Sequence, residues 1–377
     1  MRFSAQREDI HQAVAAVQRA TATRVIQPIL SNILIESVNS HTLKLSATDL
    51  DFAIETTIPA QITVEGRTTL SAKKLAEIIS KLPSQQPIVC DIDEAVQTAR
   101  IQCGTAVFDM RTLPADEFPT IKQIDEQDFL EVDGKAFVRA INQTAFAAAS
   151  YDANNVLGGV FFQLNGQGLE MAATDGSRLA KRVEAVREGE SGNLESLNVS
   201  AIIPAKTLQE FLKLCAVDVS EQPVRIAIQE GQISFRTPRY YLLSRLLDGQ
   251  YPKYNQLIPQ ENKMVAFANK KAFIDSLERT AVMANERTNI VKLAFDRNNL
   301  SLAAQTPDVG DSKDTMDVNY DGDPLNIAFN YKYVIDALKV IESDDVRMET
   351  NGPLSPTIFK GREENGYLCL VMPVQVK

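Results

Sequence analysis

The chain has 377 residues, of which 44% are hydrophobic and 23% are charged, a composition typical of a globular protein. No apolar run reaches the roughly 20 residues that a membrane helix needs, and the N-terminal segment lacks the apolar core of a secretion signal, so we expect a cytoplasmic protein without membrane contact. The formal net charge of −10 argues against a protein that coats DNA with a uniformly basic surface, although only the local field at a contact surface decides DNA binding.

The first third of the chain predicts a strand and a helix, then strands, then a second helix and a closing pair of strands. The amphipathic helix over 8–24 carries Ile10 and Val14 at helical spacing. The segment LKLSATDLDFAIETTI predicts a strand that runs into a polar turn. A second amphipathic helix follows over 71–82, and the closing strands end in the Phe-Pro pair at 118–119.

The same order recurs in the second and third parts of the chain. The polar turn after Thr48 returns after Thr174, 126 residues later, and Pro119 returns as Pro252, 133 residues later. Further amphipathic helices are predicted over 135–150, 205–215, 270–287 and 331–342. A period of about 130 residues makes each copy large enough to be a domain with its own core. We therefore expect an α+β fold of three tandem domains over residues 1–122, 128–257 and 263–377, each with two helices on one face of a mainly antiparallel sheet.

The predicted helices carry more positive charge than the rest of the chain. Over the six predicted helices, lysines and arginines exceed acidic residues by six, so the remaining residues hold a net charge of −16. Ordinary solvated helix faces would explain this excess in a single domain. In a threefold repeat, the same excess indicates a mildly basic layer of helices that attracts phosphates without gripping them.

Few residues point to catalysis. His11 lies on a predicted helix and His41 in a turn, and the sequence contains no nucleophile elbow, phosphate-binding loop or HExxH motif. The strongest catalytic candidate is Asp49 with Asp51, which would hold a divalent cation for phosphoryl chemistry if they shared one face of a strand. The other interpretation is a solvated turn, and the third copy has Pro307 in place of the equivalent aspartate. We therefore expect no cofactor and no bound metal.

The cysteine pattern favours buried thiols over disulfides or zinc ligands. Cys90, Cys103, Cys215 and Cys369 are widely spaced and form no CxxC pair. Scattered single cysteines of this kind are typical of the reduced core of a cytoplasmic protein.

Several segments, in their order and spacing, resemble one known family. The most specific are PILSNILIE (28–36), ATDLDFAIE (47–55), TLPADEFP (112–119), ATDGSRLA (173–180), LLDGQYPKY (246–254) and VMPV (371–374). Over its whole length the chain resembles the bacterial DNA polymerase sliding clamp, the beta subunit of the DNA polymerase III holoenzyme. The resemblance implies the DNA clamp fold in a head-to-tail homodimeric ring. It also implies a non-enzymatic processivity factor that encircles double-stranded DNA and slides on it without reading its sequence.

The resemblance further implies one protein-binding groove per chain. There the replicative polymerase alpha subunit, the clamp loader and other proteins with a clamp-binding motif would dock short apolar segments. The matching positions are Leu157, Thr174, Gly176, Ser177, Arg178, Leu179, Pro252, Leu257, Leu370, Val371, Met372, Pro373 and Val374. The apolar run that ends at Val374 fits either a last strand or an exposed docking surface, since Pro373 ends regular pairing. Ser177 and Gln256 stand where the family often has histidine and arginine, which alters the polar rim of the groove.

The resemblance also assigns DNA-facing and subunit-contact residues. For contacts to the DNA backbone it implies Arg24, Lys73, Arg139, Tyr151, Asn154 and Lys206. For the contact between subunits it implies Phe108 and Met110 on the first domain, Met283 and Ala284 on the third, and an ion pair made by Lys74. A strand residue buried within one domain is the alternative interpretation of Phe108.

Three hypotheses for function follow from these patterns. The first is a sliding clamp that tethers a polymerase to its template. The second is a metal-dependent phosphoesterase or nuclease that uses Asp49 and Asp51. The third is a repeat scaffold that binds proteins but not DNA. Asp49→Asn would abolish function under the second hypothesis and only perturb a turn under the first.

Overall fold

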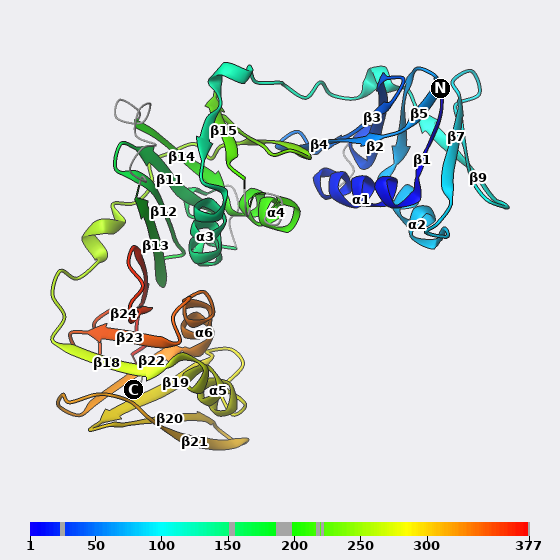
Figure 1. Ribbon diagram of the computed structural model, residues 1–377. Coiled ribbons are helices and arrows are strands. Elements are labelled where there is room, and N and C mark those ends of the chain that lie inside the picture. The colour runs from blue at the N-terminus through cyan, green and yellow to red at the C-terminus, as the bar shows by residue number, and fades with distance from the viewer. Residues whose placement is uncertain (23–26, 151–154, 186–197, 216–218, 220–221, 376–377) are drawn as a thin grey trace. The chain divides into compact units, whose positions relative to one another are not determined.

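The computed structural model describes residues 1–22, 27–150, 155–185, 198–215, 219 and 222–375 (Figure 1). Its contacts divide the chain into two compact units. The first unit comprises residues 1–135 and 210–246, and the second comprises residues 136–209 and 247–377. Each unit has its own sheets and its own buried core.

The first unit is built on one 13-stranded sheet, in the order β10-β15-β16-β17-β4-β3-β2-β6-β9-β8-β7-β1-β5. All of its strand pairs are antiparallel. The strands are β1 (Arg2–Gln6), β2 (Asn32–Asn39), β3 (Thr42–Thr48), β4 (Phe52–Pro59), β5 (Gln61–Val64), β6 (Arg67–Ser71), β7 (Pro87–Asp93), β8 (Thr98–Cys103), β9 (Ala106–Leu113), β10 (Leu130–Val132), β15 (Val224–Gln229), β16 (Gln232–Arg236) and β17 (Tyr240–Arg245).

Two helices pack against this sheet in the first repeat. Helix α1 (Arg7–Val17) lies on β3 and β4 and contacts α2 (Ala72–Lys81). The residues that recur at helical spacing in α1, Ile10 and Val14, are buried, as the periodicity predicts. On α2, Leu75 and Ile79 are buried in the same way.

The second unit contains two sheets. Its 8-stranded sheet has the order β14-β11-β12-β13-β25-β24-β23-β18, and its 4-stranded sheet has the order β21-β20-β19-β22. The strands are β11 (Gly159–Asn165), β12 (Gly168–Thr174), β13 (Arg178–Ala185), β14 (Asn198–Pro204), β18 (Met264–Asn269), β19 (Ile290–Asp296), β20 (Asn299–Thr306), β21 (Gly310–Asp317), β22 (Leu325–Asn330), β23 (Asp345–Thr350), β24 (Thr357–Gly361) and β25 (Tyr367–Val371). Strands of the second and third repeats therefore share one continuous sheet.

The other four helices agree with the sequence prediction: the one predicted over 205–215 has those bounds, and the other three end earlier than predicted. They are α3 (Gly134–Thr144), α4 (Ala205–Cys215), α5 (Lys270–Ala281) and α6 (Tyr331–Lys339). Helix α5 was expected to run to residue 287. It ends at Ala281, because the next two amides, those of Val282 and Met283, donate to carbonyls three residues back, those of Arg279 (3.4 Å) and Thr280 (3.3 Å). Asn285 then caps a further turn, accepting hydrogen bonds from the backbone amides of Arg287 (3.0 Å) and Thr288 (3.4 Å).

The three copies predicted from the sequence are present as the same α+β unit, each with two helices on antiparallel strands. The expected reduced thiols are also seen, because all four cysteines are buried thiols. Within the described ranges no helix has the length and apolar character needed to cross a bilayer.

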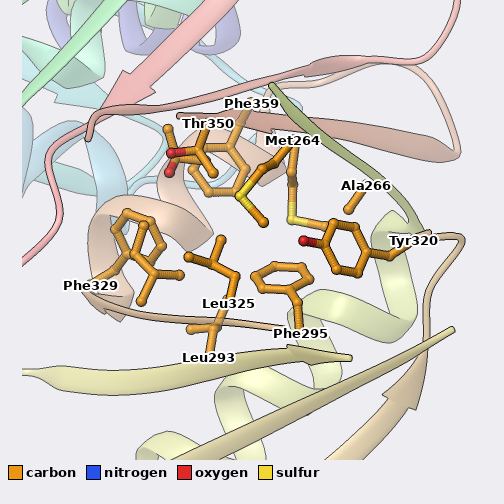
Figure 2. Close-up of a pocket in the computed structure, with 12 residues that line it drawn as sticks. Met264, Ala266, Leu293, Phe295, Tyr320, Leu325, Phe329, Thr350 and Phe359 are labelled. Carbon is orange, nitrogen blue, oxygen red and sulfur yellow. The ribbon is translucent and has the colours of Figure 1, made fainter. Parts of the chain in front are cut away.

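A small cavity lies in the core of the third repeat (Figure 2). Its walls come from β18, β19, β22, β23 and β24, with Phe295, Phe329 and Phe359 among the aromatic side chains around it. The Tyr320 hydroxyl at its edge already donates a hydrogen bond to the carbonyl of Asp323 (2.6 Å). Ligand sites combine apolar walls with several converging polar groups. We therefore interpret this cavity as imperfect core packing.

Candidate functional site

The predicted groove residues begin in the turn between β12 and β13. The Thr174 hydroxyl accepts a hydrogen bond from the Gly176 amide (3.1 Å) and donates one to the Arg178 carbonyl (2.6 Å). The Asp175 carboxylate accepts from the amides of Ser177 (2.9 Å) and Arg178 (3.0 Å). Gly176 has φ of +88°, a conformation in which a Cβ would be strained. These side chains fix the backbone at the start of β13.

The first repeat builds the same turn, which decides the role of its aspartates. Asp49 accepts hydrogen bonds from the amides of Asp51 (3.1 Å) and Phe52 (2.8 Å), while Thr48 accepts one from Leu50 (3.0 Å). Leu50 even shares the left-handed backbone, with φ of +79°. The interpretation of Asp49 and Asp51 as residues of a solvated turn is confirmed, and the alternative, that they share one face of a strand, is wrong. Among the described residues no group of three or more His, Cys, Asp or Glu could hold a metal ion.

Arg178 is held in place by contacts from three parts of the second unit. Its guanidinium lies 3.1 Å from Asp175 and 2.6 Å from Asp336, and it donates to the Phe146 carbonyl (2.8 Å). The same group stacks 4.5 Å from the ring centroid of Tyr333. The Arg178 side chain is only 10% exposed. Its contacts hold β13 to α6, so Arg178 is not a mobile residue of the groove rim.

Sequence reasoning missed Tyr333 and Asp336. A usable signal was present in the helix starts of the three repeats. The second helix begins Ala-Lys-Lys in the first copy and Ala-Lys-Thr in the second, but Tyr-Lys-Tyr in the third. Two aromatic residues at these positions in one copy only indicate a contact that the other copies lack.

The floor of the groove is an apolar cluster on one face of the 8-stranded sheet. Leu179 on β13 pairs directly with Leu370 on β25. Two tyrosines from the segment before β18, Tyr251 and Tyr254, pack against this pair, and both rings contact Phe161 with centroid distances of 5.8 Å and 5.7 Å. This cluster is the part of the predicted groove that is shared between the second and third repeats.

The rim of the groove carries the exposed apolar residues. Leu257 is 56% exposed and Met372 is 40% exposed, high values for side chains of this kind. Strand β25 ends at Val371, and the Met372 amide then donates to the Ser177 carbonyl (2.9 Å). Regular pairing therefore stops just before Pro373, as the sequence predicts.

Three of the predicted groove residues belong to neither the floor nor the rim. Val371 is fully buried and lies on the opposite face of β25 from Leu370, so it supports the groove from behind. Leu157 is partly buried in the short helix Val156–Gly158, where its neighbour Val156 packs against the floor. The Val374 amide donates to the carbonyl of Ala328 on β22 (2.8 Å), which ties the tail to the third repeat.

A cleft of about 530 Å³ opens beside the turn, and both polar and apolar residues line it. Ser177, Arg178 and Lys206 contribute polar groups, and Phe146 and Tyr333 contribute aromatic rings. The apolar cluster and this cleft meet at the Thr174–Arg178 turn.

Both tyrosines of the floor stay protonated at neutral pH. Burial raises the pKa of Tyr251 to about 12, and its hydroxyl accepts from the Thr174 amide (3.1 Å) and donates to the Gly159 carbonyl (3.3 Å). Burial also raises the pKa of Tyr254, as does its hydrogen bond to the Glu170 carboxylate (2.5 Å). The hydroxyl groups thus fix the rings in position.

The residues predicted to contact DNA fall into three groups. Arg24, Tyr151 and Asn154 lie outside the described residues. Lys73 on α2 and Lys206 on α4 are exposed. Arg139 on α3 is already bound to Glu184 through two hydrogen bonds (2.6 Å and 2.9 Å), which raise the pKa of its guanidinium. Its charge is therefore largely neutralised within the chain.

The residues predicted at the subunit contact lie on β9 and in the turn after α5. Phe108 and Met110 are half-buried on β9, and Met283 and Ala284 are half-buried just after α5. Lys74, for which an ion pair across the contact was expected, lies 2.8 Å from Glu77 on its own helix, and both side chains are exposed.

Comparison with known proteins identifies similar chains over the full length. Family models for the N-terminal, central and C-terminal domains of the DNA polymerase III beta subunit match residues 1–122, 131–253 and 255–375. The chain is 31% identical to the beta sliding clamp of Synechococcus elongatus and 30% identical to that of Bacillus subtilis, and each alignment covers all of both chains. The crystal structure of the Bacillus subtilis clamp matches with a TM-score of 0.91 at 29% identity, again over all of both chains. The Pseudomonas aeruginosa clamp bound to griselimycin matches equally completely, with a TM-score of 0.90 at 27% identity.

Proposed function

Because the chain belongs to the beta sliding clamp family, the beta subunits of DNA polymerase III, it is a processivity subunit in DNA replication and not an enzyme; we propose that two copies form a head-to-tail ring that encircles duplex DNA. In this proposal the ring slides on DNA and tethers the replicative polymerase and other proteins. The three predicted domains, 1–122, 128–257 and 263–377, are its structural modules.

The observation that carries the proposal is a repeated strand pairing. The strand after the polar turn of one repeat pairs with the last strand of the next repeat, β4 with β17 and β13 with β25. Strand β21 follows the corresponding turn of the third repeat, and within the described residues β20 is its only strand partner. Residues 106–110 of β9, the last strand of the first repeat, pair only with β8 there. The missing pair is therefore β21 of one chain with β9 of another.

Exposed apolar side chains near both edges support this pairing. Val107 on β9 is 51% exposed, and Val282 and Val309 beside β21 are 76% and 71% exposed. An unpaired strand edge with apolar residues needs cover to avoid aggregation. A contact that joins two different surfaces is heterologous, and it forms a ring when the rotation closes. In the proposed ring it closes after two chains.

The helix layer would face the DNA in this proposal. Lys73 and Lys206 are the exposed cations that we assign to phosphate contacts, and Arg139 would contribute less because Glu184 neutralises it. A small number of phosphate contacts gives weak, sequence-independent attraction. Such attraction lets a ring slide, because topology and not affinity keeps it on the duplex.

The groove is proposed to dock short apolar segments of partners. Leu257 and Met372 supply exposed, adaptable apolar surface above the buried floor. The alpha subunit of the polymerase, the clamp loader and other proteins with such segments are the expected partners. The griselimycin complex of the Pseudomonas clamp supports a ligand-binding surface on proteins of this fold.

Topology on DNA provides the direct test. The chain is loaded on closed circular DNA by an ATP-driven clamp loader, and the DNA is then cut once. The ring hypothesis expects retention on the closed circle through gel filtration and release after the cut. Retention after linearisation, or no retention on the closed circle, would overturn the ring. A protein scaffold without DNA binding gives no retention in either case.

A further inference from the structure

A row of basic side chains runs across the same sheet face as the groove floor. On β13 and β25, the floor residues Leu179 and Leu370 pair with each other, and the next side chains on that face are Lys181 and Leu368, which also pair. Two residues along a strand span about 7 Å. The floor of the groove and this second row are therefore immediate neighbours.

The row continues onto the next two strands. Lys360 follows the Phe359–Cys369 pair by one residue, which places it opposite Leu368, and it pairs with Arg347 on β23. From β13 to β23 the row crosses three strand spacings, about 14 Å. Three cations thus lie in one line that begins beside the groove.

The carboxylates near the row do not balance it. Lys360 and Arg347 share one acidic partner, the buried Glu349, at 2.9 Å and 2.5 Å. Lys181 has its own partner in Glu170 at 3.1 Å. One positive charge is left over, on a chain whose formal net charge is −10.

A fourth cation extends the row and stays open to solvent. The Arg362 side chain is 51% exposed, stacks 5.1 Å from the Phe267 ring centroid and lies 3.5 Å from the half-exposed Asp345. The one carboxylate that lines the same pocket, Glu364, is engaged by Arg182 at 3.1 Å. The surface presented to solvent here is basic.

These cations line a pocket that is continuous with the groove. The pocket has a volume of about 570 Å³, and Lys181, Arg347, Lys360 and Arg362 are its cations. Its wall includes Ile258, which also packs against the apolar floor.

We propose that this pocket binds the acidic residues of a partner segment whose apolar part occupies the neighbouring groove. The proposal rests on the proposed docking function and names a second element of recognition, two or more aspartates or glutamates next to the apolar motif. Charge complementarity gives such contacts specificity, and each exposed pair adds a modest amount to affinity.

The length of the row favours a peptide over a single bound anion. A phosphate is much smaller than 14 Å, whereas four extended residues cover about that distance. Carboxylates on alternate residues of an extended segment would face successive cations of the row. The partner is therefore an acidic stretch that continues from the docked apolar residues.

Two matched peptides test the proposal. Both carry the apolar docking segment of the polymerase alpha subunit from the same bacterium. One is extended by four glutamates and the other by four glutamines, at the N-terminus or at the C-terminus in separate syntheses. Binding to the full chain is measured by fluorescence anisotropy at low and at physiological salt.

The variant Lys360→Gln/Arg362→Gln removes two cations while Arg347 still pairs with Glu349. Its control is Lys292→Gln/Arg297→Gln, the same charge change at exposed positions of the 4-stranded sheet and the turn beside it. Thermal unfolding checks that both variants remain folded.

The parent chain is expected to bind the glutamate peptide, in at least one orientation, about 5- to 30-fold more tightly at low salt than the glutamine peptide. That ratio should fall below about 2 in the Lys360→Gln/Arg362→Gln variant and persist in the control. The proposal is overturned if both peptides bind the parent equally in both orientations, or if the ratio survives in the variant. An oligonucleotide whose binding depends on these two cations, with no difference between the peptides, would assign the row to nucleic acid and also overturn it. If neither peptide binds the parent chain at either salt concentration, the docking function itself fails, which is a separate result.

Discussion

Arg178 shows how one residue can hold two repeats together. In the first repeat the equivalent position is Phe52, which is buried as part of an apolar core. In the second repeat the position carries an arginine that binds Asp175, Asp336 and a backbone carbonyl. The turn itself does not require arginine, since it also forms ahead of Phe52. The arginine therefore serves the contact between β13 and α6.

Arg178→Ala is expected to destabilise the second unit by about 2–3 kcal/mol, because it leaves the nearly buried Asp175 carboxylate without its cation. For a unit of this size, that corresponds to a fall in Tm of roughly 5–10 °C, measurable by differential scanning calorimetry. Arg178→Lys should recover less than half of the loss, since an ammonium cannot reproduce the planar fork. The control is Arg279→Ala, which breaks an ion pair of a largely exposed arginine and should shift Tm much less. Equal shifts for Arg178→Ala and Arg279→Ala would contradict this role.

Ionisation of the Tyr251 hydroxyl makes the folding stability of the groove floor depend on pH in the alkaline range. Its pKa is raised by burial to about 12, above the value near 10 of an unfolded chain, so the folded state holds this proton more tightly. The stability that it contributes is fully present below pH 10 and is lost as pH rises from 10 to 12. Tyr251→Phe is expected to show a shallower loss over that range in urea unfolding. At pH 8 the same variant should lose about 1 kcal/mol with the hydrogen bond to Thr174. An unchanged alkaline slope would contradict the assignment of this group.

At the level of elements, the local spacing of apolar residues predicted the helices, but it did not predict the contacts between segments far apart in the sequence. The spacing of Ile10 and Val14 was enough to predict α1, because one helix buries one stripe. The pairing of β4 with β17 was not predictable, since strands far apart in sequence share the same alternating pattern. The groove residues came from the family resemblance. Tyr251 and Tyr254 could not be placed in it without knowing which strands meet.

The two sheet edges make a prediction about assembly. If β9 of one chain pairs with β21 of another, Phe108→Asp and Met283→Asp should each weaken the dimer by at least about 30-fold, the effect expected for a hot-spot residue. Sedimentation velocity over a range of concentrations measures the shift to monomers. Leu354→Asp is the control, because Leu354 is 63% exposed and lies in the turn between β23 and β24. This control should remain a dimer.

Mixing the two variants tests the head-to-tail arrangement. A Phe108→Asp chain has an intact β21 edge, and a Met283→Asp chain has an intact β9 edge. One undamaged contact can therefore form between them, and the mixture should contain open dimers that neither variant forms alone. A contact that uses the same surface on both chains would show no such recovery, which would rule out the heterologous ring.

For the whole molecule, the charge pattern distinguishes electrostatic affinity for DNA from topological retention of a closed ring on DNA. The chain is acidic overall, and the cations of its helix layer are partly neutralised, Arg139 by Glu184 and Arg279 by Asp314. Direct affinity for DNA should therefore be low and steeply dependent on salt. A closed ring would nevertheless stay on circular DNA, because leaving requires the ring to open.

The double variant Lys73→Ala/Lys206→Ala tests whether affinity or topology retains the protein on DNA. Removal of two phosphate contacts per chain should lower the slope of log affinity against log salt by about 2 for each bound chain, in direct binding to a linear duplex. Retention of loaded chain on a closed circle should not change, because topology does not depend on these charges. Lys292→Ala/Arg297→Ala removes the same charge from the 4-stranded sheet and its turn and should change neither quantity. If the lysine variant instead leaves closed circles faster at moderate salt, the two cations hold the chain on DNA by affinity, and a ring around the duplex is not what retains it.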